Sequence, residues 1–432
     1  MHGREENMAH QAVWALAIFL VVYAFIISGK IHRTVATMAG ALLAAALGLG
    51  GGGPFLERTV HALGLMIGMM ILTGVTAETG AFRFLAVWAA RKAQGDPGRL
   101  LIWLALVTAA GAAFLNEHLA VLVMAPVTLW LTRLLGVSPL PYLLAQAAAA
   151  AAGGTATLAG SASNMMIGSA VRELEYSSFI VHLAPVAALI LLVNLGLIIL
   201  LYRNRLRALP ERMSEVMGME PAAQVTDRKL LVKCMAAIVL TVAGLFFHNV
   251  LNVAPAVVAL SGAFLLLLMA GGRAPVHALA RVDWTVVFCV GGLLAVSSAL
   301  AETGAAAWLA GAVANFTGSH MAAAAMLILG TSALASAWAD NLPFVAVMIP
   351  VIQEMGAWGA SNQQVLWWSL ALGAGLGGSG TLIGAGAGLP MAAMAAKEGR
   401  AIRFAAYLKA AFPLMLLSVA LAGVYVYLRY LL

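Results

Sequence analysis

Gly153-Gly154-Thr155-Ala156-Thr157-Leu158-Ala159-Gly160 is followed, 224 residues further along the chain, by Gly377-Gly378-Ser379-Gly380-Thr381-Leu382-Ile383-Gly384. Two more pairs of strings keep this spacing: Ala77-Glu78-Thr79-Gly80 with Ala301-Glu302-Thr303-Gly304, and Val123-Met124 before Pro126 with Val347-Met348 before Pro350. Chance similarity between apolar segments would not hold one register across three separate strings. The repeat therefore predicts two related halves, each interrupted by a stretch rich in glycine and threonine.

The composition places both halves in a membrane. Of the 432 residues, 63% are hydrophobic and 9% are charged, compared with about 25% charged in a soluble domain. Apolar runs of about 20 residues, the length that crosses a bilayer core, follow one another along the chain. Such runs must satisfy their backbone polar groups internally. We therefore expect an all-α polytopic membrane protein that lies in a lipid bilayer.

The charged residues and the cysteines exclude two other classes of site. The net charge is +7, but the basic residues lie between the apolar runs, where they act as orientation signals rather than as a nucleic-acid surface. Cys234 and Cys289 both lie within apolar runs. We expect them to be buried hydrophobic side chains that form neither a disulfide nor a metal site.

A polar stretch with seven Lys and Arg residues, 202–233, divides the chain. It predicts a cytoplasmic linker at 202–229 between a first repeat, 1–201, and a second repeat, 230–432. In each repeat two apolar runs meet at a short polar tip, and a longer run is interrupted by glycines. These patterns predict a re-entrant hairpin and a discontinuous helix. The predicted hairpins are 99–135 and 321–358, and the predicted broken helices are 141–170 and 363–396.

A hairpin returns to the side from which it enters, so five full membrane-spanning helices remain in each repeat and the second repeat should be inverted. With the N-terminus outside, 20 of the 24 Lys and Arg residues lie on the inner side, as the positive-inside rule requires. We expect a multi-pass protein of the cell (inner or plasma) membrane with both termini extracytoplasmic. The segments 81–92 and 305–317 are too short to span and predict interfacial helices.

The two hairpin tips carry the polar residues that we expect to form the site. The first tip is Asn116-Glu117 and the second is Asp340-Asn341, so each has one carboxylate and one amide, in opposite order. Ionisable residues within a membrane usually line an ion or substrate path, and a carboxylate can hold a cation or exchange a proton. A structural role, in which each acid caps the second helix of its hairpin, is compatible with this. His118 is expected to be a hydrogen-bonded structural residue.

The interruptions offer further polar groups to the same site. Their side chains are Thr155, Thr157, Ser163 and Asn164 in the first and Ser379 and Thr381 in the second. Half-helix ends at such breaks face polar or anionic solutes, and the unwound carbonyls coordinate cations. Close helix packing is the alternative explanation of the glycines. Because no lysine follows the glycines, the breaks are not phosphate loops, and we expect neither ATP nor another cofactor.

Several strings, in their order along the chain, resemble those of the ion-transporter superfamily. They are Lys30-Ile-His32-Arg33-Thr34-Val35, Glu78-Thr-Gly80, Asn116-Glu117, Gly154-Thr-Ala-Thr157-Leu with Asn164, Asp340-Asn341-x-Pro343-Phe344 and Gly380-Thr381-Leu382-Ile383-Gly384. The resemblance covers nearly the whole chain. It is to the branch of ArsB-type arsenite permeases, NhaD-type sodium–proton antiporters and the P protein, which share a citrate-transporter-like domain.

This resemblance implies two inverted repeats, a homodimer, and elevator-type alternating access in which the hairpins and broken helices move against a dimerising frame. It implies that the substrate and coupling ions bind at Asn116, Glu117, Thr155, Thr157, Ser163, Asn164, Asp340, Asn341, Ser379 and Thr381. A Na⁺ ion is expected at Asn116, Asp340 and the carbonyls of the breaks. The sequence departs from the branch's common pattern in three places: Glu117 replaces Asp, Ser161-Ala162-Ser163 lacks a carboxylate, and Gly388 replaces Asn.

The expected function is secondary export of arsenite, antimonite or Na⁺ in exchange for protons. A Na⁺-coupled symporter of di- or tricarboxylates is the alternative. That alternative is disfavoured because no Arg or Lys lies at a tip or a break in the sequence. No nucleophile–base pair is recognisable, so we do not expect an enzyme.

Overall fold

The structure is a computed structural model that describes residues 2–50, 52–171, 173–271, 274–318, 320–357 and 363–432. Throughout these ranges the regular elements are helices and no strand occurs. Nine helices of this part have the length and apolarity needed to cross a membrane, which confirms the expected all-α polytopic fold. Arg172 and Arg273, which entered the charge count, and residue 358 of the second predicted hairpin lie outside the described residues.

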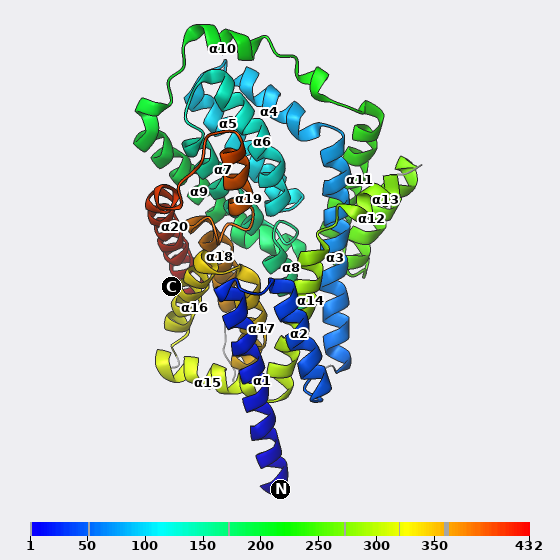
Figure 1. The fold of residues 1–432 in the computed structure, drawn as a ribbon. Helices are drawn as coiled ribbons and strands as arrows, with labels where there is room; N and C mark the ends of the chain where they lie inside the picture. The colour runs from blue at the N-terminus through cyan, green and yellow to red at the C-terminus, as the bar shows by residue number, and fades with distance from the viewer. Residues whose placement is uncertain (1, 51, 172, 272–273, 319, 358–362) are drawn as a thin grey trace.

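The helices follow the predicted order in both repeats. Those of the first repeat are α1 (His2–Ser28), α2 (Arg33–Ala46), α3 (Gly53–Glu78), α4 (Ala81–Lys92), α5 (Pro97–Phe114), α6 (Glu117–Leu135), α7 (Leu140–Ala156), α8 (Ala162–Ala170) and α9 (Tyr176–Tyr202). A connecting segment then runs along the top of Figure 1 with η1 (Arg203–Arg205), α10 (Pro210–Met217) and η2 (Pro221–Gln224).

The second repeat comprises α11 (Arg228–Phe247), α12 (Pro255–Ala270), α13 (Ala274–Ala280), α14 (Trp284–Glu302), α15 (Ala305–Thr317), α16 (Met321–Trp338), α17 (Asn341–Ala357), α18 (Gln364–Gly377), η3 (Gly378–Gly380), α19 (Gly388–Lys397), α20 (Phe404–Val426) and η4 (Tyr427–Leu431). Apart from α13, each long helix has a counterpart about 224 residues earlier: α5 and α16 are offset by this number at both ends. In Figure 1, α4 lies near the linker at the top, whereas its counterpart α15 lies at the bottom, near the N-terminus. The opposite orientation of the two repeats across a bilayer stays a prediction.

The two repeats meet at equivalent positions. Asn194 in α9 donates a hydrogen bond from Nδ2 to Oγ of Ser418 in α20, over 3.0 Å, and these residues are 224 apart. Both side chains are buried. The related helices α9 and α20 therefore pack against each other, and this seam joins the repeats through their own copies of one position.

Both long helices are interrupted where the sequence predicts. Thr157 ends α7 with an extended backbone (φ −135°, ψ 160°), and Thr381 follows η3 with nearly the same angles (φ −139°, ψ 163°). Each threonine hydroxyl donates to a carbonyl in the neighbouring hairpin, Thr157 to Ala113 and Thr381 to Ala337, both over 2.5 Å. These matched bonds fix each break against the first helix of its own hairpin.

The glycines before the breaks also serve packing. A Cβ atom at Gly153 would collide with the backbone of Ala109, and one at Gly377 with the backbone of Ala333. Ala109 and Ala333 belong to α5 and α16, so α7 and α18 approach the hairpins at backbone distance. The packing explanation of these glycines therefore holds beside their role in interrupting the helix.

Candidate functional site

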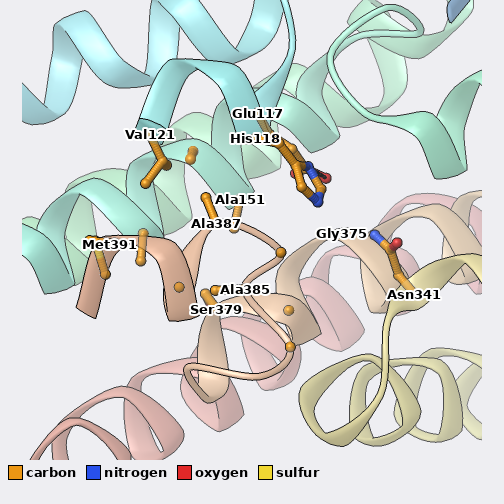
Figure 2. A pocket seen from close by; sticks show the side chains of 16 residues that line it. Glu117, His118, Val121, Ala151, Asn341, Gly375, Ser379, Ala385, Ala387 and Met391 are labelled. Carbon is orange, nitrogen blue, oxygen red and sulfur yellow. Dashed lines mark ion pairs between the residues drawn. The ribbon is translucent and has the colours of Figure 1, made fainter. Parts of the chain in front are cut away.

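A cavity of about 40 Å³ lies where the first hairpin tip meets the second break. Its walls come from α6, α7, the start of α17, the end of α18 and the loop before α19. Figure 2 shows Glu117 and His118 on one side of it, with Asn341 reaching in from another element. Since a water needs about 10–15 Å³, the cavity has room for a few waters or one small solute.

Glu117 places a carboxylate in this cavity at the first residue of α6. Its backbone N–H donates to the carbonyl of Gly160 over 2.9 Å, which ties the first tip to the first break. The residue is 9% exposed. In the described part of the chain, the one basic group within 4 Å of the carboxylate is the His118 imidazole, with Nδ1 3.7 Å from Oε1. Gly154 leaves space for it, because a Cβ there would lie 2.5 Å from Oε2.

The cap of α6 is the amide of Asn116 rather than an acid. Asn116 Oδ1 accepts from the backbone N–H groups of His118, over 2.9 Å, and Leu119, over 3.4 Å. The expectation that the acid caps the second helix is therefore wrong for the first tip. Its physical reason is position: Asn116 precedes the first helical turn, where a side-chain oxygen can reach the free N–H groups, whereas Glu117 already lies within it.

At the second tip the carboxylate of Asp340 forms an ion pair with Arg33, the first residue of α2. The side chain of Asp340 is 12% exposed and that of Arg33 is 30% exposed. The expectation that no basic residue reaches a tip is therefore wrong in three dimensions. Arg33 was assigned to a loop as an orientation signal, but the junction of α1 and α2 lies at mid-height in Figure 1, level with the tips. A contact across 307 positions has no sequence signature.

Asn164 closes the first break internally. Its Nδ2 lies 3.3, 3.1 and 2.8 Å from the carbonyl oxygens of Gly154, Thr155 and Thr157, while Oδ1 is buried without a partner in the described structure. The carbonyls that were expected to coordinate a cation thus face an amide N–H₂ group. In the second break the corresponding residue is Gly388, which has no side chain to do this.

The predicted hydroxyls bond mostly to the main chain. Thr155 donates to Ala151 over 2.6 Å, Ser379 donates to Leu376 over 2.8 Å, and Thr157 and Thr381 bond to the hairpins as described above. Ser163 Oγ lies 3.0 Å from Ser161 Oγ and accepts from Asn341 Nδ2 over 3.4 Å, so it links the first break to the second tip. Of the ten predicted residues, Glu117, Asn341 and Ser379 line the cavity.

His118 is a cavity residue that was expected to be only structural. Its imidazole lies against the second break so closely that a Cβ atom at Gly386 would collide with Nε2. The side chain therefore connects the first tip with the loop before α19. Its place directly after Glu117 was the available signal, since α6 turns both side chains towards the same loop.

Comparison with known proteins places these features in a family. Residues 23–373 match the family described as citrate transporter. The chain is 34% identical over 433 residues to a 46 kDa membrane protein of Mycobacterium leprae, across 97% of this chain and 99% of that protein. It is 35% identical over 432 residues, with the same coverage, to an uncharacterized transporter of Mycobacterium tuberculosis. It is also 30% identical over 498 residues to the P protein of Homo sapiens, across 94% of this chain and 59% of that protein.

A solved structure shares the fold. The YdaH transporter of Alcanivorax borkumensis matches with a TM-score of 0.60 and 12% identity over 98% of both chains. These matches confirm the resemblance to ion transporters that the repeated strings indicate. The chain is a multi-pass membrane transporter, and it belongs to the citrate transporter family.

Proposed function

We propose that the protein is a secondary active transporter that exports a small solute, arsenite or antimonite or Na⁺, in exchange for protons. The observation that carries this proposal is the Glu117 carboxylate, which lines a small cavity with no Lys or Arg within 4 Å among the described residues. A carboxylate in a membrane-embedded site can hold a proton or a cation. Competition for one such group couples the movement of one to the movement of the other.

The size and lining of the cavity favour a small solute. Besides Glu117, its polar side chains are those of His118, Asn341 and Ser379. Arsenite at neutral pH is an uncharged trihydroxide, which an amide, a hydroxyl and a carboxylate can bind through hydrogen bonds. A Na⁺ ion would take the carboxylate and amide oxygens instead.

A Na⁺-coupled symporter of di- or tricarboxylates is the second candidate. It is favoured by the family's description and by Arg33, which brings a cationic group to the second tip. Against it, the guanidinium already pairs with Asp340, and no other Lys or Arg side chain lines the cavity in the described part of the chain. An anion with two or more charges would therefore meet mainly the carboxylate of Glu117.

The movement that we propose is of the elevator type in a homodimer. The two hairpins and the two broken helices, with α9 and α20, would move together, because hydrogen bonds tie each break to its hairpin and the Asn194–Ser418 bond joins the halves. The frame would comprise α1–α3, α11, α12 and α14. The apolar side chains exposed on α1, α11 and α12 suit contact with lipid or with a second copy.

Purified protein in proteoliposomes tests this proposal. A pH gradient should drive movement of arsenite or Na⁺, measured in parallel with succinate. Glu117→Gln should abolish it, whereas Glu398→Gln, which removes a partly exposed carboxylate paired with Arg133 (3.0 Å), should leave it intact. Movement of succinate alone would favour the second candidate, and full activity of Glu117→Gln would show that this carboxylate does not couple transport.

A further inference from the structure

The two tips differ in charge, and the difference is matched by one residue elsewhere in the chain. Asn116 and Asp340 occupy equivalent positions, as do Glu117 and Asn341. Arg33 pairs with Asp340, but the position equivalent to Arg33 in the second repeat is Val257. The guanidinium is therefore present only at the tip whose equivalent residue in the other repeat is uncharged.

Arg33 is delivered to the tip by a firmly held helix. The hydroxyl of its neighbour Thr34 donates to the carbonyl of Thr285 in α14 over 2.8 Å. Further along, a Cβ atom at Gly292 would lie 2.7 Å from the carbonyl carbon of Thr37, so α2 and α14 touch at backbone distance. The start of α2 is thus fixed on α14, and Asp340 on the hairpin comes to it.

The charges around the two tips then sum to one uncompensated group. Asp340 and Arg33 neutralise each other, and Asp283 at the start of α14 uses Oδ1 to cap that helix, accepting from Val286 N–H over 3.2 Å. Glu117 remains, with the neutral or protonated His118 beside it. Two unpaired carboxylates at membrane depth would be far costlier than one.

We propose that Arg33 is a charge-compensating specificity residue, which limits the site to one monovalent cation or proton per transport cycle. This inference rests on the proposed function. With Arg33 in place, a single proton or Na⁺ at Glu117 makes the loaded site neutral. Without Arg33, Asp340 would demand a second cation before the hairpins and broken helices could move through the membrane.

The test compares Arg33→Gln, Asp340→Asn and the double variant in proteoliposomes. The ratio of protons to arsenite, or of protons to Na⁺, is measured from the pH gradient that just stops net flux. Arg33→Gln should slow transport by about tenfold or more and raise the ratio from one to two, because a buried carboxylate has lost its partner. The double variant should regain most of the rate and a ratio of one.

Two controls separate this idea from a general loss of structure. Arg281→Gln removes a half-exposed arginine whose Nε lies 2.7 Å from Oε1 of Glu78, and it should change neither rate nor ratio. Thermal unfolding in detergent should show lower midpoints for both single variants and recovery in the double variant.

Several outcomes would overturn the proposal. They are an unchanged ratio in Arg33→Gln, wild-type transport in that variant, a double variant as slow as the singles, or losses of thermal stability that simply add. If the wild-type protein moves none of the probes, the proposed function fails. The thermal cycle still reports whether Arg33 and Asp340 act as a pair.

Discussion

Asn164→Ala should destabilise the protein far more than removal of an equally buried asparagine elsewhere. The amide of Asn164 faces three carbonyls of the first break, and its two hydrogens can make two full bonds at once. Each lost bond costs about 1 kcal/mol, and a buried carbonyl left without a donor adds about 1–3 kcal/mol. We expect a loss of about 3 kcal/mol or more in the free energy of unfolding.

Asn194→Ala is the matched control. Asn164 is fully buried and Asn194 is 3% exposed, and the Oδ1 atom of each lacks a partner in the described structure. Asn194 makes a single bond, to Ser418, whose hydroxyl keeps its own bond to the carbonyl of Leu414 (2.8 Å). Its removal should therefore cost only about 1 kcal/mol.

Equilibrium unfolding in mixed detergent micelles, followed by tryptophan fluorescence, measures both losses on one scale. A difference of about 2 kcal/mol between the two variants is expected from these bond counts. Equal losses would refute the idea that Asn164 holds the break together. They would also reopen the possibility that the three carbonyls are free to bind a cation.

Three further variants test local contacts. Gly386→Ala should push the His118 imidazole away and slow transport, and adding His118→Ala should restore part of the rate; a slower double variant would contradict the contact. Thr157→Val and Thr381→Val should each lower the free energy of unfolding by about 1 kcal/mol and by similar amounts, because their bonds are equivalent; chemical unfolding measures both, and a clear inequality would refute the symmetry. Gly154→Ala should displace the Glu117 carboxylate, so arsenite or Na⁺ flux should fall at normal expression levels; unchanged flux would argue against a crowded carboxylate.

The helices and their interruptions could be predicted from the sequence because their causes are local. Apolar length defines each span, and the glycine and threonine clusters interrupt α7 and α18 where they occur. The spacing of 224 residues then predicts that whatever happens in one repeat recurs in the other. The matched bonds of Thr157 and Thr381 follow from that rule.

The site was less predictable because its contacts join parts of the chain that no repeat relates. The ion pair between Arg33 and Asp340 has no copy in the other half, so the repeat spacing gives no hint of it. The hydroxyls and the amide in the breaks were identified correctly as polar groups inside a membrane protein. Their partners are backbone carbonyls freed by the same breaks, which was hidden until the backbone path was known.

The seam at Asn194 and Ser418 has a consequence for the history of the chain. In an assembly of two identical chains, one gene would specify both residues at such a contact, and both hairpin tips would carry the same charge. An acid and its arginine would appear twice or not at all. Joining the copies in one polypeptide removes that restriction. Covalent fusion is thus what permits an Asp–Arg pair at one tip and an amide at the other, and with it a two-fold scaffold that encloses a site without two-fold symmetry.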